Sequence, residues 1–246
     1  MTPFGLDAWE IALATAAFAA SGIVRGFGGG IGANFLTAPV LAALVGPREA
    51  VPIVMLLNMV GNLQLLPQTL PRVNWRDGWP LFFFPILTVP LGGWLLFTVD
   101  EDVMRRAIAA AALAFSLLLL SGWRYRGGHR IGPSIATGSV AGVLVGSVSL
   151  GGPPAFLYLL ARSGDAATNR AQFVMFGTTA GLAALVMFTA SGAYRLETVL
   201  FAAFLTVPAA LGIWLGSILF RRASEDLFRQ VCLWGLVAVS LCVLVL

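Results

Sequence analysis

The chain has 246 residues, of which 59% are hydrophobic and only 11% are charged, and its mean hydropathy is +0.90. This composition lies far from that of soluble domains and predicts an integral membrane protein. All 15 basic residues are arginine, which excludes a phosphate-binding loop ending in Gly-Lys-Ser/Thr. The arginines behind the net charge of +4 are scattered over the connections between apolar stretches, so they indicate membrane topology rather than binding of nucleic acid.

Apolar stretches follow one another along the whole chain. They are continuous and rich in Leu, Ala and Phe, which favours helices over the alternating strands of a β-barrel. A helical span needs about 20 residues, so most of the stretches can cross a bilayer. We predict an all-α membrane protein, a polytopic helical bundle of about 8–10 apolar segments, located near 11–28, 31–46, 50–67, 79–99, 103–122, 132–149, 151–162, 168–190, 197–220 and 227–246.

Glycine is concentrated at two places about half a chain apart. The first is the stretch 22–39, GIVRGFGGGIGANFLTAP, and the second contains Gly142, Gly146, Gly151 and Gly152. Glycine this dense disfavours a plain helix by about 1 kcal/mol per residue and permits close approach of backbones. Each cluster therefore predicts a short, broken or re-entrant helix pair.

The two halves of the chain repeat each other at an offset of 120 residues. The offset aligns Gly22 with Gly142 and Gly92 with Gly212, and it also aligns Gly26, Gly32, Val54, Met55, Gly61 and Trp94 with identical residues. We predict a first repeat over 1–123, an inter-repeat loop over 124–131 and a second repeat over 132–246, together forming one transmembrane domain.

Loop charge orients the chain. Ten arginines fall in the connections near 68–78, 122–131, 162–170 and 220–229, and four fall on the other side. The side richer in arginine is cytoplasmic, which places both termini in the periplasm and makes the two repeats inverted. In secondary transporters built from inverted repeats, the substrate site lies near the midplane, where interrupted helices of the two halves meet.

Arg25 is the most informative charge, because only apolar residues and glycines surround it. If the first glycine segment turns back within the membrane, Arg25 and the backbone N–H groups of Gly28–Gly32 form a cationic site suited to an oxyanion. If the first stretch crosses completely, Arg25 is an anchor at the cytoplasmic interface. The sequence leaves both interpretations open.

Polar residues within the apolar stretches complete the candidate site. Their alternative role is hydrogen bonding between helices, which polar side chains in membranes commonly perform; Arg170, at the start of its span, either closes the site or only follows the charge rule. The candidate substrate-binding residues are Arg25, Gly28, Gly29, Gly30, Gly32, Asn34, Asn58, Asn62, Ser147, Ser149, Gly151, Gly152, Arg170, Gln172 and Thr178.

The motif GIVRGFGGGIGANFLTAPVLAALVGPREAV, with GSVAGVLVGSVSLGGPPAFLYLL and NRAQFVMF in the second half, resembles the TauE/SafE family of sulfite and organosulfonate exporters. The family signature, a glycine-rich turn followed by proline, matches Gly28–Gly32 with Pro39 and Gly151–Gly152 with Pro153. Ser149 and Leu150 stand where further glycines are usual. The resemblance covers nearly the whole chain and implies transport of small anions, often containing sulfur, across the bacterial inner membrane.

The repeat architecture predicts a secondary transporter that exports a small anion by alternating access. The resemblance implies that the anion is sulfite, an organosulfonate or a related organosulfur anion. The alternatives are an anion channel or a membrane assembly factor without carrier turnover. We expect no enzymatic activity, because the only histidine, His129, lies in the inter-repeat loop. We also expect no metal and no cofactor; the expected partners are the anion and the lipid bilayer, and the sequence leaves a homo-oligomer open.

Overall fold

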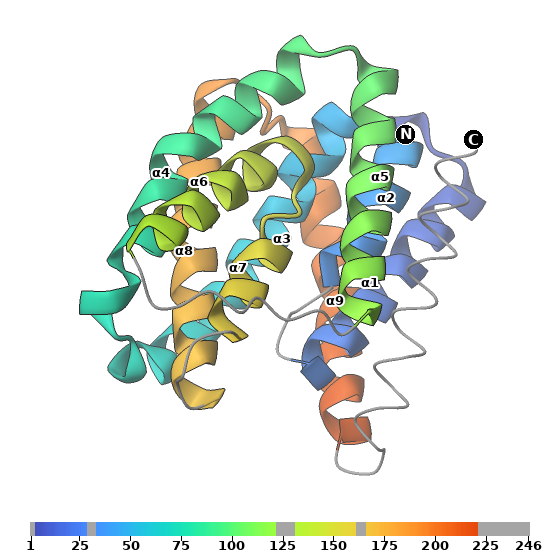
Figure 1. Ribbon diagram of the computed structural model, residues 1–246. Helices are drawn as coiled ribbons and strands as arrows, with labels where there is room; N and C mark the ends of the chain where they lie inside the picture. The colour runs from blue at the N-terminus through green and yellow to red at the C-terminus, as the bar shows by residue number, and fades with distance from the viewer. Residues whose placement is uncertain (1–2, 29–32, 122–130, 161–165, 221–246) are drawn as a thin grey trace. The chain divides into compact units, whose positions relative to one another are not determined.

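The computed structural model describes residues 3–28, 33–121, 131–160 and 166–220. Regular structure in these ranges is entirely helical (Figure 1). Two short 3₁₀ helices, η1 (Pro3–Gly5) and η2 (Leu70–Arg72), accompany the α-helices. The α-helices are α1 (Ala8–Gly28), α2 (Ala33–Val45), α3 (Pro47–Thr69), α4 (Trp75–Thr98), α5 (Glu101–Leu120), α6 (Ile131–Val148), α7 (Gly152–Leu160), α8 (Ala166–Ala190) and α9 (Leu196–Phe220).

The predicted helical class is confirmed, and the first nine apolar stretches each coincide with one helix. The tenth, 227–246, lies outside the described residues. Six helices of the described part are long and apolar enough to cross a membrane, namely α1, α3, α4, α6, α8 and α9. The chain is therefore a multi-pass membrane protein.

Local hydrogen bonds fix several helix ends. Asp100 caps α5, since its carboxylate accepts from the backbone N–H groups of Asp102 (3.0 Å) and Val103 (3.3 Å). Asn74 does the same before α4, accepting from the N–H of Asp77 at 3.2 Å. These caps satisfy N–H groups that a helix start otherwise leaves open.

The structure divides into two compact units. Unit 1 comprises residues 1–54, 99–123 and 194–246, and unit 2 comprises 55–98 and 124–193. Each unit contains helices from both predicted repeats, and α3 contributes its first eight residues to unit 1 and the remainder to unit 2. The division concerns packing and does not test the repeat boundaries, which stay a prediction.

In unit 1, α1 packs along α9 (Figure 1). The two backbones meet at glycines: a methyl group at Gly22 would overlap the carbonyl oxygen of Ala209 and lie 3.0 Å from the Cα of Gly212. In the same way, a methyl group at Gly212 would overlap the carbonyl oxygen of Ala19. Small residues allow this close helix approach within a bilayer.

In unit 2, α4 packs along α6 in the same manner (Figure 1). A methyl group at Gly92 would overlap the carbonyl oxygen of Val143 and lie 3.0 Å from the Cα of Gly146. A methyl group at Gly142 would meet Pro85, one of three prolines within α4. Each crossing therefore joins the first helix of one half to the fourth helix of the other half.

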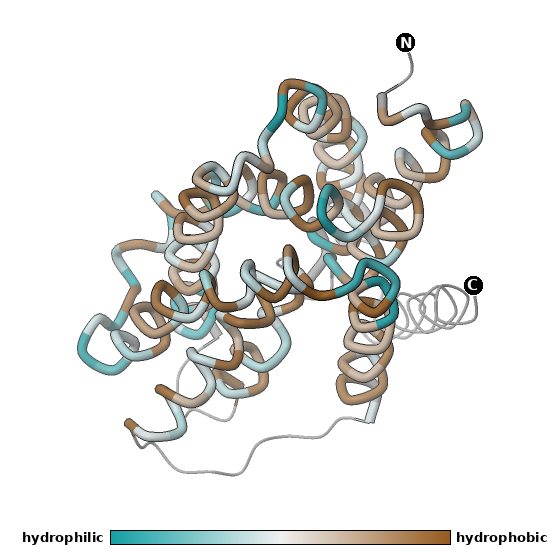
Figure 2. Tube along the Cα trace, turned by 90° about the horizontal axis from the view of Figure 1, so that it is seen from above, coloured by the Kyte–Doolittle hydropathy of each residue, from teal (hydrophilic) through white to brown (hydrophobic). Residues whose placement is uncertain are grey.

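Large apolar side chains remain exposed along several helices, as expected of a surface that contacts lipid tails. Trp94 on α4 and Trp214 on α9 are both 61% exposed, and Val186 on α8 is 69% exposed. In Figure 2 the hydrophilic residues lie mainly where helices begin and end, whereas hydrophobic residues line their length. This distribution matches helices embedded in hydrocarbon.

Candidate functional site

Arg25 lies in the last turn of α1, at the end of the candidate span Ala8–Arg25, and its side chain is partly buried. Gly28 ends α1, and Asn34 lies in the first turn of α2. Between them, Gly29, Gly30 and Gly32 fall outside the described residues. The two interpretations of Arg25, as an anion site or as an interfacial anchor, both stay predictions.

The second glycine cluster forms a sharp reversal between α6 and α7. Helix α6 ends at Val148, and Ser149 adopts a positive φ of 64°. The N–H of Leu150 then donates to the carbonyl of Leu144 at 3.2 Å. Gly151 packs against the carbonyl of Ala141, so the chain turns back on α6 at once. A non-glycine residue in this conformation is uncommon and occurs preferentially at functional turns.

The residues of this reversal offer few donors to a ligand. Helix α7 begins Gly152-Pro153-Pro154, and proline has no backbone N–H. The start of α7 therefore has two fewer donors than an ordinary helix start, which weakens it as an oxyanion cradle. The hydroxyl of Ser147 donates to the carbonyl of Val143 at 2.7 Å, within its own helix.

The third helices of the two halves, α3 and α8, meet at an asparagine. The carboxamide of Asn62 lies against Gly177, where a methyl group would come 2.8 Å from Nδ2. Three residues before Asn62, the sulfur of Met59 lies against Gly181. Asn62 is partly buried and makes no hydrogen bond to another described residue. Asn58 lies one turn away on the same helix and is also partly buried.

Hydroxyl groups beside this contact bond to their own helix. Thr178 is buried, and its hydroxyl donates to the carbonyl of Val174 at 2.8 Å. Thr179 donates to Met175 at 3.2 Å. The two threonine hydroxyls can still accept hydrogen bonds, but their protons are already donated within α8. At this crossing Asn62 is therefore the side chain best placed to donate to a ligand.

Gln172 was predicted to bind substrate, but its side chain forms a hydrogen bond within the protein. It is 2% exposed, and its Nε2 donates to the backbone carbonyl of Asn74 at 3.0 Å. Its Oε1 lies against Gly78. Gln172 thus joins α8 to the start of α4. Arg170, two residues earlier, is exposed, and residues two apart lie on different faces of a helix.

A second contact of this kind lies in unit 1. The hydroxyl of Thr198, at the start of α9, is fully buried and donates to Oε2 of Glu49, at the start of α3, at 2.8 Å. No sequence pattern indicates this pair, because the 120-residue offset aligns Thr198 with Gly78 and Glu49 with Asn169. The spacing of Gly177 and Gly181, by contrast, is typical of a close helix contact.

Among the described residues, no group of three or more His, Cys, Asp or Glu side chains could hold a metal ion. The structure brings Asn62 together with α8, and Gln172 with the start of α4. Arg25 and Asn34 belong to unit 1, whereas the second-half candidates from Ser147 to Thr178 belong to unit 2.

A family model described as "Sulfite exporter TauE/SafE" matches residues 13–243, nearly the whole chain. No curated protein matches. No solved structure matches either.

Proposed function

Because the chain belongs to the sulfite exporter TauE/SafE family, we propose that it is a secondary transporter that exports a small anion, sulfite or an organosulfonate. We place it in the bacterial inner membrane with both termini in the periplasm, as the loop arginines predict. In a cell whose interior is negative, efflux of a monoanion gains about 2.3 kcal/mol per 100 mV. Export of an anion therefore needs no further driving ion.

The observation that carries the proposal is the reciprocal packing of the two halves. Helix α1 packs on α9 near Gly22 and Gly212, and α6 packs on α4 near Gly146 and Gly92. Gly92 and Gly212 are partners at the 120-residue offset. Each first helix thus meets the fourth helix of the other half, which is the reciprocity expected of two repeats related by a two-fold axis. Inverted repeats are the architecture with which many carriers alternate their access.

Two side-chain contacts support the same arrangement. Glu49, near the start of α3, reaches Thr198 at the start of α9. Gln172, near the start of α8, reaches Asn74 before α4. In both cases a third helix is joined to the beginning of the other half's fourth helix. The predicted re-entrant glycine helices also belong to this proposal.

For the substrate site we propose the contact between α3 and α8. The Nδ2 group of Asn62 can donate hydrogen bonds to an oxyanion, and the contact of its carboxamide with Gly177 holds it beside α8. Asn58 lies on the same face one turn away. Arg25, in unit 1, is proposed as the cation of the first glycine segment, where its planar guanidinium offers paired donors to an oxyanion.

Flux of sulfite from liposomes that contain the purified protein tests the proposal. We expect saturable efflux, which separates a carrier from a channel; flux proportional to concentration over the whole range, or no flux, would refute it. Asn62→Ala should raise the half-saturating concentration at least tenfold, because a hydrogen bond to a charged group contributes about 1.5–3 kcal/mol. Gln64→Ala is the matched control, since Gln64 lies on α3 and is exposed.

Arg25 is tested separately by anion affinity. Arg25→Lys should retain weak binding and Arg25→Gln should lose about 2–5 kcal/mol, the effect of removing one partner of a buried charged contact. Arg195→Gln, at an exposed position before α9, is the control. Equal affinities of the wild type and Arg25→Gln in the same detergent would establish the interfacial-anchor role instead.

A further inference from the structure

The connection between α3 and α4 carries two arginines without an acidic partner. Arg72 ends η2 and Arg76 lies in the first turn of α4, and both are exposed. The carboxylate of this turn, Asp77, accepts a hydrogen bond from Nδ2 of Asn74 at 2.9 Å. Neither arginine forms an ion pair or a hydrogen bond with any described residue. Two positive charges are therefore left for a ligand.

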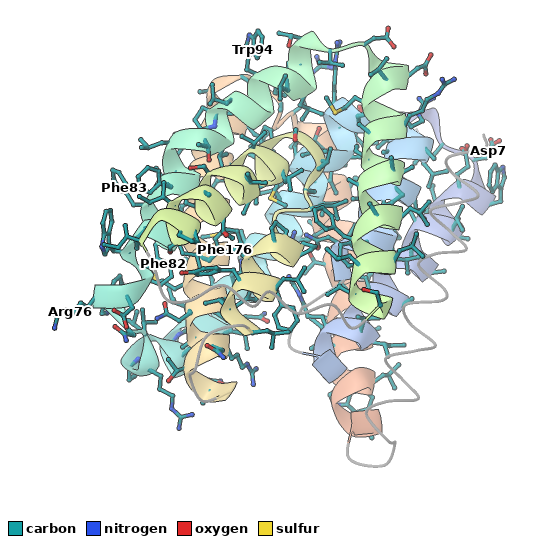
Figure 3. The ribbon with its side chains drawn as sticks, viewed as in Figure 1. Asp7, Arg76, Phe82, Phe83, Trp94 and Phe176 are labelled. Atoms are coloured by element: carbon teal, nitrogen blue, oxygen red, sulfur yellow. The ribbon has the colours of Figure 1, made fainter. Side chains whose placement is uncertain are left out.

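An exposed apolar ridge begins beside these arginines. Trp75, Trp79, Phe83 and Leu87 follow one another at steps of four residues along α4, and their exposed fractions are 53%, 46%, 48% and 54%. The ridge rises about 18 Å from Trp75 to Leu87. In Figure 3, Arg76 lies near one end of α4, Phe83 further along it, and Trp94 toward the other end.

Helix α4, which carries the ridge, matches the thickness of a bilayer. Trp75 and Trp94 are 19 residues apart, about 28 Å along the helix, close to the roughly 30 Å hydrocarbon thickness. Tryptophan prefers the level of the lipid headgroups. Arg72 and Arg76 thus lie at headgroup level, whereas Phe83 and Leu87 lie at the level of the acyl chains. The opposite side of α4 is occupied by α6, which packs against Pro85 and Val89.

We infer that this surface, formed by Arg72, Arg76 and the ridge Trp75–Leu87, binds one anionic phospholipid. The guanidinium groups hold the headgroup phosphate, which arginine can engage with two parallel N–H donors. One acyl chain follows Trp79, Phe83 and Leu87. A zwitterionic lipid offers the same phosphate but no net charge, so it binds more weakly. The contact of Gln172 with Asn74 couples this surface to α8, so the lipid also stabilises the start of α4.

Thermal unfolding of the full chain in a neutral detergent, titrated with phosphatidylglycerol, tests the inference. A ligand that binds the folded state raises Tm with its concentration. We expect the Arg72→Gln/Arg76→Gln variant to need at least tenfold more phosphatidylglycerol for the same rise. Arg72→Lys/Arg76→Lys should lie between this variant and the wild type, because lysine keeps the charge but not the paired donors. The matched control is Arg106→Gln/Arg195→Gln, which removes two exposed arginines elsewhere and should leave the titration unchanged.

Further measurements test whether the bound phosphate belongs to a lipid headgroup or is free phosphate, and whether an acyl chain contacts the ridge. Inorganic phosphate at the same concentrations should not raise Tm, and phosphatidylcholine should raise it less than phosphatidylglycerol. Phe83→Ser should weaken the response to phosphatidylglycerol severalfold. The inference is overturned if both double glutamine variants respond alike, if inorganic phosphate stabilises as well as the lipid, or if phosphatidylcholine equals phosphatidylglycerol.

Discussion

The crossing of α4 and α6 predicts a specific loss of stability in Gly92→Ala. The added methyl group would overlap the carbonyl oxygen of Val143 and come 2.9 Å from the N of Ser147 and 3.0 Å from the Cα of Gly146. All three are backbone atoms, which cannot rotate away as a side chain can, so the helices must separate. Overpacking of this kind costs about 1–3 kcal/mol, and alanine regains about 1 kcal/mol of helix propensity. We expect a net loss of up to about 2 kcal/mol.

Unfolding of the purified variants in one detergent measures this loss. Gly132→Ala is the matched control, because Gly132 lies in α6 and has nothing within 4 Å of the added methyl group; it should be neutral or stabilising by up to about 1 kcal/mol. Gly212→Ala, at the equivalent crossing of α1 and α9, should resemble Gly92→Ala. A Gly92→Ala protein as stable as Gly132→Ala would refute the reasoning.

Three further results are expected. Cysteines introduced into the connection 124–130 should react with reagents only from the cytoplasm, and labelling from the periplasm would overturn the orientation and the inversion of the repeats. Thr198→Val should cost about 1 kcal/mol in unfolding free energy, because Glu49 loses a donor, whereas Thr189→Val, whose hydroxyl bonds only its own exposed helix turn, should cost less. Burial raises the pKa of the Tyr194 hydroxyl above its ordinary value. Above about pH 10 the unfolded chain therefore loses this proton before the folded chain does, and the free energy of unfolding falls as pH rises. Tyr194→Phe should reduce that fall, and an unchanged dependence of stability on pH would contradict the role of Tyr194.

The sequence by itself determined the helical class and the positions of the helices. Long, uninterrupted apolar runs can satisfy their backbone in a bilayer only as helices or closed barrels, and nine predicted stretches coincide with α1 to α9. Glycine density also indicated close backbone approach in the stretch that begins at Gly22, which the structure places against α9, whereas the crossings at Gly92 and Gly212 were not predicted. This information is local, since it depends on the composition of each segment.

Only the tertiary structure decided which groups touch. A glycine indicates that another backbone can approach closely, but not which helix does so. The pairing of α1 with α9 and of α4 with α6 therefore could not be deduced from either segment alone. Gln172 looked like a ligand for substrate, yet it contacts the carbonyl of Asn74, 98 residues away. Ser147 and Thr178 bond to their own helices, whereas Asn62 does not. Residue type fixes how many hydrogen bonds a side chain can make, and the packing of distant helices fixes where they are made.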